Sequence, residues 1–192
     1  AEHIECDFMR CPAYVYARDA KGAKRLKKTL SALDFVGTKA AFSADSALGF
    51  GASGYLKIDQ QAKYNPLKYL FALVDVCDKS GIQIYEQTEV TKVEKGAVNI
   101  LHTNGDYTVH AAHVLEATHY PLSPQPLKLL FKKAWYTTYV LEIFLPKNIL
   151  PEALFIDLAT PYHYIRVDTG SDRDRLIIGG SDHRSDIKIS EK

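Results

Sequence analysis

Tyrosines and an arginine alternate along the segment YHYIRV, residues 162–167. Alternate side chains of a β-strand point to the same face, so Tyr162, Tyr164 and Arg166 are expected to lie together. A guanidinium binds a carboxylate through paired hydrogen bonds, and phenol rings can cover the bound molecule. The pattern indicates a site for an anionic small molecule, although an exposed strand face with amphipathic tyrosines is the simpler local explanation.

The segment VHAAHVLEATHYP, residues 109–121, is a second candidate. Its strand-like part, HVLEAT, ends in the small residues Ala117 and Thr118. Small residues at the end of a buried strand let a bulky ligand or another backbone approach closely. On local sequence alone, a plain strand terminus explains them more simply.

The glycines of GFGASG, residues 49–54, match the spacing of a dinucleotide-binding loop. Such a loop lies between a buried strand and a helix whose first amide groups hold the pyrophosphate. Here the strand-like YLKIDQ follows, so we predict a turn or bulge with flexible glycines. The chain also lacks zinc-site spacings, the G-x-S-x-G turn of serine hydrolases and a phosphate-loop lysine. The motifs therefore favour neither a metal site, nor a hydrolase, nor a nucleoside triphosphatase.

Charges nearly cancel along the chain, with 24 Lys and Arg against 23 Asp and Glu and a net charge of +1. No overall field therefore favours nucleic acid or an anionic membrane as a partner. Three scattered cysteines suit a reducing compartment, so we predict a cytoplasmic protein. No apolar run approaches the roughly 18 residues of a membrane helix, and the first residues, AEHIECDF, resemble the middle of a longer protein.

Two helices are predicted. In residues 21–37 lysines form the solvated face, and the apolar face consists of Leu26, Leu30 and Leu33. In residues 65–81, Asn65 is a suitable cap, Pro66 fits the first helical position and Gly81 can end the helix. The apolar stripe of this second helix contains Leu67, Leu70, Phe71, Val74 and Cys77. Cys77 is expected to be a small buried side chain rather than a catalytic thiol.

Strands account for most of the remaining elements. CPAYVYAR, residues 11–18, is predicted as a strand in which Pro12 suits an edge or first position. Asn104-Gly105 predicts a hairpin with a type I′ turn, within a small meander that also includes IQIYE and EVTKVE. Four further strands are predicted at AWYTTYVLEIFL, ALFIDL, YHYIRV and DRLIIGG. This tally indicates an α+β fold with a mixed, largely antiparallel sheet and two main helices.

The order of these pieces resembles the middle of FAD-dependent oxidoreductases of the D-amino-acid oxidase, glycine oxidase and sarcosine oxidase superfamily. In that family a capped helix beginning with Pro leads to a segment like IQIYEQTEV, then to a small meander and a strand ending beside the flavin; residues 65–121 follow this order. CDFMRCPAYVYAR resembles the first substrate-domain strands, and residues 162–184 resemble a later Y-x-R to G-G-x-D segment. ATHYP with GGSDH is most similar to the subgroup that carries a Rieske iron–sulfur domain.

The resemblance implies oxidation of a C–N bond of an amine or amino acid, with FAD accepting the hydride. In this family's pattern, the backbone at Val90 would lie near the adenine of FAD, with Ala117 and Thr118 beside its pyrophosphate. Tyr164 would orient the substrate, and Arg166 would pair with its anionic group. The resemblance assigns no catalytic side chain and no metal ligand to this chain.

The resemblance also implies an internal fragment. Substrate-domain strands are expected in residues 1–64 and 122–192, around part of the FAD domain in residues 65–121. The family's glycine-rich FAD turn would precede residue 1, and a Rieske [2Fe–2S] centre would lie in a downstream domain. We therefore expect this chain alone to be inactive and to bind no FAD, and its partners to be the rest of the flavoprotein and a small amine or amino acid. A non-catalytic α+β binding or scaffold module is the alternative.

Overall fold

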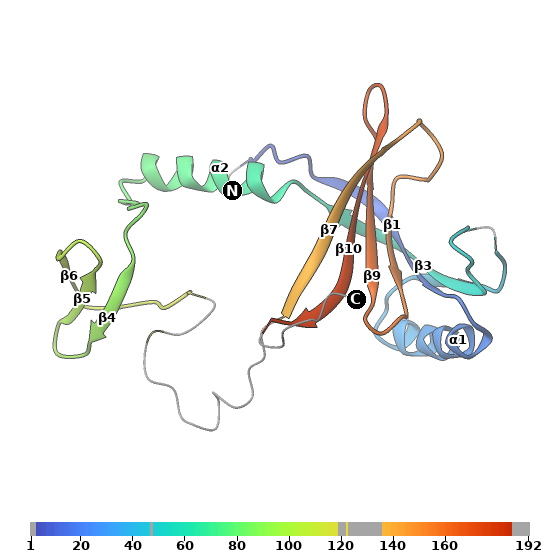
Figure 1. Cartoon of the computed structure of the whole chain (residues 1–192), viewed down its shortest axis with the longest axis horizontal. Coiled ribbons are helices and arrows are strands. Elements are labelled where there is room, and N and C mark those ends of the chain that lie inside the picture. The colour runs from blue at the N-terminus through green and yellow to red at the C-terminus, as the bar shows by residue number, and fades with distance from the viewer. Residues whose placement is uncertain (1–2, 47, 119–121, 123–135, 186–192) are drawn as a thin grey trace, which may run out of the picture. The chain divides into compact units, whose positions relative to one another are not determined.

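The computed structural model describes residues 3–46, 48–118, 122 and 136–185, which contain two helices and ten strands (Figure 1). The chain divides into two compact units, residues 1–70 with 135–192 and residues 71–134, and the division falls within the second helix. The helices are α1 (Ala20–Phe35) and α2 (Pro66–Lys79). The strands are β1 (Met9–Ala17), β2 (Ala40–Ser43), β3 (Gly54–Lys63), β4 (Val90–Glu94), β5 (Asn99–Thr103), β6 (Thr108–Ala111), β7 (Tyr136–Leu145), β8 (Leu154–Asp157), β9 (His163–Asp168) and β10 (Asp174–Arg184).

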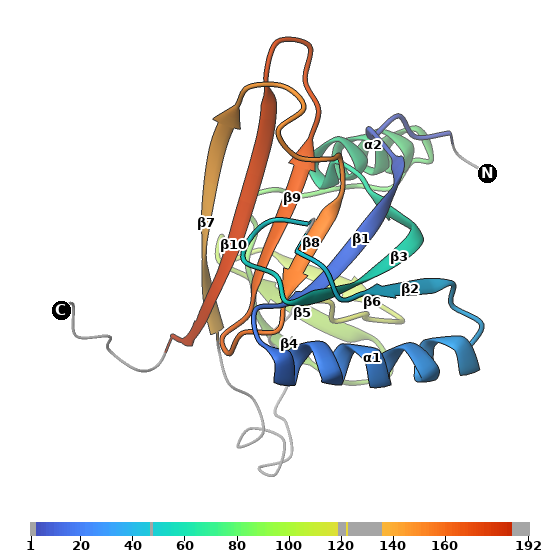
Figure 2. The ribbon, with the colours of Figure 1, turned by 90° about the vertical axis from the view of Figure 1, so that its right-hand side faces the viewer.

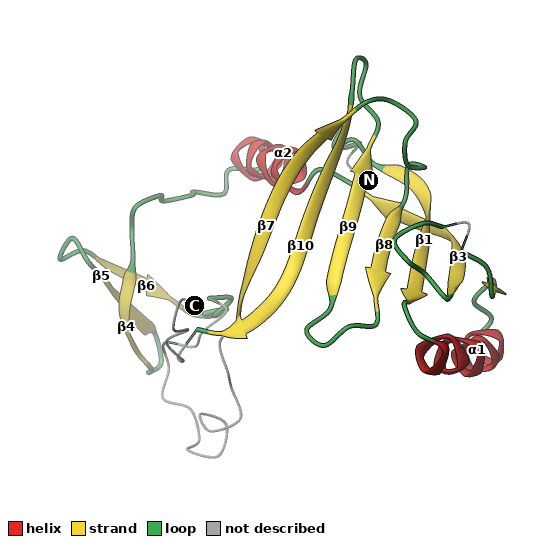
Figure 3. Ribbon diagram, turned by 45° about the vertical axis from the view of Figure 1, so that its right-hand side comes forward, coloured by secondary structure: helices red, strands yellow, loops and turns green. Residues whose placement is uncertain are grey.

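Seven strands of the first unit form one sheet in the order β2-β3-β1-β8-β9-β10-β7 (Figure 3). Among the strand pairs of the described residues, β1 and β8 are parallel and all others are antiparallel. The second unit contains a three-stranded antiparallel sheet, β4-β5-β6. These elements confirm the predicted α+β class, the mixed and largely antiparallel sheet and the two main helices.

Alternate residues of β1 contribute to two separate cores, because neighbouring side chains of a strand point to opposite faces. Tyr14 and Tyr16 pack into the larger core, where the Tyr14 ring stacks on Phe155 at 5.2 Å. Val15 and Ala17 face the other side, where α1 packs (Figure 2). The buried side chains of the larger core are Tyr16, Ala52, Ala153, Phe155, Ile165, Val167 and Leu176.

Helix α1 forms as its sequence pattern predicts. The Asp19 carboxylate accepts a hydrogen bond from the backbone N–H of Gly22 at 2.6 Å, which satisfies one of the free amides of the first turn. Leu26 is fully buried, and Leu30 and Leu33 pack around the same core. The helix thereby covers β1, β2 and β3 with its apolar face.

Pro12 occupies a bulge rather than a sheet edge. Strand β1 begins at Met9 and lies between β3 and β8, so Pro12 is neither at the edge of the sheet nor at the first position of the strand, and both predicted alternatives are wrong. The register with β3 shifts between Cys11 and Ala13, on either side of the proline. A bulge removes the need for a ladder hydrogen bond at that residue, and proline has no N–H to donate.

The GFGASG segment is a turn, as predicted. Gly49, Phe50 and Gly51 have φ values of 76°, 57° and 67°, in the left-handed region. Strand β3 begins at Gly54, so no helix follows the glycines. Phe50 packs edge-on against Phe155 at 5.3 Å, and the turn thereby closes the larger core.

The Asn104-Gly105 hairpin exists, but its turn type differs from the prediction. The N–H of Thr103 donates to the carbonyl of Tyr107 at 3.0 Å, which closes a loop of three residues. The left-handed residue is Asp106, with φ 58°, and not the Asn-Gly pair. This geometry is the three-residue hairpin loop, in which a type I turn is followed by one left-handed residue. Aspartate tolerates that conformation because its short side chain can hydrogen-bond locally.

Helix α2 has the predicted ends but not the predicted burial. The Asn65 side chain accepts from the N–H groups of Leu67 at 3.1 Å and Lys68 at 3.2 Å, and Gly81 has φ 75°. None of the described side chains of α2 is buried, and Cys77 is only half-buried. The prediction of a buried Cys77 is therefore wrong, because helical spacing shows which residues share a face but not what covers that face.

Two predicted strands are absent from the described residues. HVLEAT, which ends in Ala117 and Thr118, and IQIYE both have irregular backbones. An apolar segment forms a β-strand only where a neighbouring strand forms backbone hydrogen bonds with it. None of the described strands pairs with either segment. His119, Tyr120, Pro121 and most of the Pro-rich connection after them lie outside the described residues. Neither described helix is long and apolar enough to cross a membrane.

Candidate functional site

Tyr164 lies across the central part of the large sheet, on the face opposite Ile165 and the larger core. Its register partners are Ile156 on β8 and Gly179 on β10, so the three residues form one row. A Cβ atom added at Gly179 would lie 2.1 Å from Cζ of Tyr164. The phenol ring therefore covers the space above Gly179, and glycine is required there to admit it.

A hollow of about 410 Å³ lies beside the start of β9, and Tyr162 connects it to Tyr164. Tyr162 lines the hollow, and its ring centroid lies 6.4 Å from that of Tyr164. The other lining residues are Tyr136, Thr160, Pro161 and Asp182. Phenol rings and a proline make the lining largely apolar, with a carboxylate at one side, which suits a small molecule that has both apolar and cationic parts.

Arg166 shares the sheet face of Tyr164, as the alternation predicted, but its guanidinium already has partners. Its Nε donates to both carboxylate oxygens of Asp168, at 2.8 and 3.1 Å. An Nη atom donates to the carbonyl of Tyr64 at 2.7 Å. A substrate carboxylate would therefore have to share Arg166 with Asp168 or displace it.

Asp168 is the centre of a cluster that pattern analysis did not predict. Lys63 is buried, and its Nζ lies 2.7 Å from a carboxylate oxygen of Asp168 and 2.7 Å from one of Glu152. Lys63 also donates to the carbonyl of Val167. Arg175 donates to Asp168 at 2.9 Å and lies 3.4 Å from Glu142. Three cations face three carboxylates, so the cluster is balanced in charge.

The pKa of Asp168 reflects two opposing effects. Burial raises the pKa, but hydrogen bonds from Arg166, Lys63 and Arg175 outweigh it and lower the pKa from 3.8 to about 2. Glu152 behaves similarly: burial raises its pKa, and hydrogen bonds from Lys63 and Thr169 bring the pKa below its usual value. Both carboxylates are therefore ionised at neutral pH and hold the cations in place.

The candidate flavin-contacting residues lie in the second unit. Val90 begins β4, is half-buried and pairs with Thr103 on β5. Ala117 and Thr118 are exposed and lie outside the strands. The described residues contain no glycine-rich loop at a helix start that could bind a pyrophosphate, because neither described helix begins after a glycine-rich turn.

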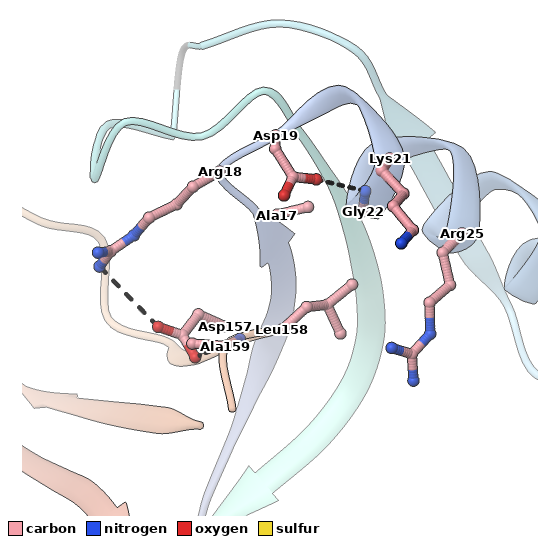
Figure 4. A pocket seen from close by; sticks show the side chains of 9 residues that line it. All are labelled: Ala17, Arg18, Asp19, Lys21, Gly22, Arg25, Asp157, Leu158 and Ala159. Atoms are coloured by element: carbon pink, nitrogen blue, oxygen red, sulfur yellow. Dashed lines mark hydrogen bonds and ion pairs between the residues drawn. The ribbon is translucent and has the colours of Figure 1, made fainter. Parts of the chain in front are cut away.

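A second hollow, of about 380 Å³, lies at the start of α1 and was not predicted from the sequence (Figure 4). Arg18 and Asp157 face each other across it at 3.9 Å, and Lys21 and Arg25 project from the first turns of the helix. Asp157 is fully buried. Among the described residues, no cluster of three or more His, Cys, Asp or Glu side chains could hold a metal ion.

The first unit thus contains a large mixed sheet and a hollow lined largely by aromatic side chains. The chain belongs to the DAO family of FAD dependent oxidoreductases, whose family model matches residues 1–191. FAD is thus the cofactor of the family. This result confirms the family predicted from the order of the sequence segments.

Individual relatives and solved structures are also similar to this chain. The chain is 23% identical over 185 residues to YhfW of Bacillus subtilis (strain 168), whose name describes a Rieske 2Fe-2S iron–sulfur protein; the match covers 96% of this chain and 36% of YhfW. The glycine oxidase of Geobacillus kaustophilus superposes with a TM-score of 0.74 at 17% identity, over 97% of this chain and 52% of that one. L-proline dehydrogenase from P. horikoshii superposes with a TM-score of 0.64 at 16% identity, over 91% and 49%. The chain thus spans about a third to a half of the length of these relatives.

Proposed function

We propose that this chain is the substrate-side part of a longer flavoprotein that oxidises a C–N bond of an amine or amino acid. The match of the FAD dependent oxidoreductase family over residues 1–191 carries this proposal. The names of the solved neighbours, glycine oxidase and L-proline dehydrogenase, point to amino acids as the substrate class. We further propose the division made from the sequence, with substrate-domain strands in residues 1–64 and 122–192 and part of the FAD domain in residues 65–121.

Tyr164 orients the substrate in this proposal. The ring is fixed because it lies over Gly179 and beside Tyr162, so its hydroxyl has a defined position on the sheet face. A hydroxyl can donate to a substrate carboxylate or accept from a substrate ammonium group. Holding the reacting bond in one orientation is the main contribution that a protein makes to such a reaction.

Arg166 pairs with the carboxylate of the substrate. Asp168 holds the guanidinium by Nε, and this contact orients the rest of the group before any ligand arrives. A preorganised guanidinium loses less entropy on binding than a free side chain does. A substrate carboxylate must compete with Asp168 for the guanidinium. We therefore expect Arg166 to contribute modestly to substrate affinity and strongly to the orientation of the bound substrate.

Bound FAD would supply the redox chemistry of this family by accepting a hydride from the carbon attached to the substrate nitrogen, whose C–N bond is thereby oxidised to C=N. In our proposal the backbone at Val90 lies near its adenine, and the small residues Ala117 and Thr118 leave room beside its pyrophosphate. A pyrophosphate cradle would come from another part of the longer protein. The Rieske name of YhfW supports a further proposal, a [2Fe–2S] centre in that longer protein.

The test uses the natural full-length protein, purified without added cofactor. A visible spectrum with flavin bands that bleach with dithionite is expected, and broad iron–sulfur absorption would support the Rieske proposal. Glycine and L-proline are then mixed anaerobically with the oxidised protein, and flavin bleaching is followed by stopped flow. A protein that takes up no FAD would overturn the proposal.

Two variants test the individual residues. Arg166→Ala is expected to raise the half-saturating substrate concentration by roughly tenfold, the effect of one charged hydrogen bond, and Tyr164→Phe to slow flavin reduction. Matched controls are Arg173→Ala, a largely exposed arginine, and Tyr107→Phe, an exposed tyrosine of the second unit. If both test variants behave like these controls, the two residue roles are wrong even if the protein is a flavoenzyme.

A further inference from the structure

Three side chains from three strands form a hydrogen-bonded chain at one end of the large sheet. Asp157 ends β8, His163 begins β9 and Ser181 lies on β10. Nδ1 of His163 is 3.0 Å from Oδ2 of Asp157, and Nε2 of the same ring is 3.3 Å from Oγ of Ser181. A hydroxyl next to an imidazole that is itself oriented by a carboxylate is the arrangement that activates nucleophilic serines.

Asp157 fixes the imidazole. Its side chain is 2% exposed and accepts hydrogen bonds from the backbone N–H groups of Ala159 at 3.1 Å and His163 at 2.9 Å. Burial raises the pKa of Asp157, but the hydrogen bonds from His163 and Ala159 outweigh it and leave the pKa below its usual value. An ionised carboxylate only accepts hydrogen bonds, so Nδ1 of His163 must carry the ring proton. In the neutral imidazole, Nε2 is then the acceptor, and it faces the Ser181 hydroxyl.

The backbone of β10 brings Ser181 to the imidazole. A Cβ atom added at Gly180 would lie 2.6 Å from the carbonyl oxygen of Tyr162 and 2.8 Å from Cα of His163, so glycine permits the close approach of the two strands. The register of β10 with β7 shifts between Gly180 and His183, which places Ser181 in a bulge. Ser181 is exposed and has φ 55°. A residue that is not glycine costs about 1 kcal/mol or more in this conformation, so the surrounding structure must maintain it.

We propose that Ser181 is an activated nucleophile that reacts with carboxylic esters, a second activity distinct from C–N oxidation. Oγ attacks the ester carbonyl carbon and transfers its proton to Nε2 of His163. The carbon–oxygen bond to the alcohol breaks, and the alcohol leaves with the proton from the imidazolium, which the Asp157 carboxylate stabilises. Water then cleaves the acyl-serine and releases the acid. The solvent-exposed position of Ser181 gives an ester and water access to the hydroxyl.

A fluorophosphonate probe tests this proposal directly in the natural full-length protein. Attack by Oγ forms a phosphorus–oxygen bond and expels fluoride, while His163 takes the proton. Peptide mass spectrometry is expected to find the label on Ser181. Ser181→Ala should abolish the label, and His163→Gln and Asp157→Asn should slow labelling by about a hundredfold or more, the usual contribution of a general base. Ser171→Ala, which removes an exposed serine from the turn between β9 and β10, is the matched control.

A second variant keeps the proposal testable if the His163 or Asp157 variants do not fold, as judged by circular dichroism. Ser181→Cys is nearly isosteric, and a thiol beside an oriented imidazole is alkylated faster than a free thiol. Iodoacetamide should modify position 181 at least about tenfold faster than a cysteine introduced by Ser171→Cys. Equal alkylation rates, a label that persists in Ser181→Ala, or labelling no faster than in His163→Gln would each overturn the proposal and make Ser181 an ordinary surface hydroxyl.

Discussion

The buried cluster around Asp168 makes a quantitative prediction about stability. The pKa of Asp168 is lowered from 3.8 to about 2 in the folded protein, a difference that corresponds to about 2 kcal/mol of stabilisation of the ionised form. Since the folded-state pKa is the lower one, this stabilisation is fully present above about pH 4 and is lost as the pH falls through 2. Asp168→Asn removes the ionisable carboxyl group and with it this pH-dependent stabilisation.

We expect Asp168→Asn to lower the free energy of unfolding by about 2 to 4 kcal/mol at pH 7. The upper end applies because the substitution also leaves Lys63, which is buried, with one carboxylate partner in place of two. The measurement is urea-induced unfolding followed by far-ultraviolet circular dichroism, from pH 7 to pH 2. The difference between the two proteins should narrow as the pH approaches 2, because Asp168 of the wild type is then about half protonated and its protonated form resembles asparagine.

Two comparisons sharpen the test. Asp172→Asn changes a carboxylate that is 84% exposed and pairs with the neighbouring Arg173, so it should change stability by less than about 0.5 kcal/mol. Lys63→Met removes a cation that lowers the pKa of Asp168, so acid unfolding should begin at a higher pH. A loss of stability in Asp168→Asn that stayed constant down to pH 2 would refute the electrostatic explanation and point to packing. No loss at all would refute the role of the cluster in stability.

Three further substitutions test other parts of the structure. Gly179→Ala would place a Cβ atom 2.1 Å from Tyr164, so we expect a loss of about 1 to 3 kcal/mol in urea unfolding and a displaced phenol ring. Asp19→Ala removes the cap of α1 and should cost about 0.5 to 2 kcal/mol, which thermal unfolding can detect. Asp106→Gly should be neutral or stabilise by up to about 1 kcal/mol, because glycine adopts φ 58° without steric cost; a clear loss would contradict the assigned turn.

Local sequence patterns predicted local structure well. The ends of α2 were correctly predicted because Asn65, Pro66 and Gly81 act on the backbone within a few residues of themselves. Tyr164 and Arg166 were correctly placed on one face because strand alternation depends on backbone geometry alone. The hairpin at Asn104-Gly105 was found, but its loop length depends on which residues of the two strands pair, and composition does not fix that register.

Features that join distant parts of the chain were missed. Lys63 and Asp168 are 105 residues apart, and no spacing rule connects a lysine at the end of one strand to an aspartate at the end of another. The hydrogen-bonded arrangement of Asp157, His163 and Ser181 was likewise not predicted, because the G-x-S-x-G motif describes only a serine on a strand-to-helix turn. Such arrangements are defined by geometry and not by order in the sequence.

The parallel pairing of β1 with β8 has a consequence for how the chain is made. It joins residues 13–16 to residues 154–157, so the two halves of the large sheet meet only after about 140 intervening residues have been synthesised. During translation, one edge of β1 would wait unpaired while the second unit emerges from the ribosome. Contacts of such large sequence separation form slowly, and an unpaired edge invites association with other chains. Expression at low temperature or with added chaperones should therefore raise the yield of native protein more than any substitution in the loops.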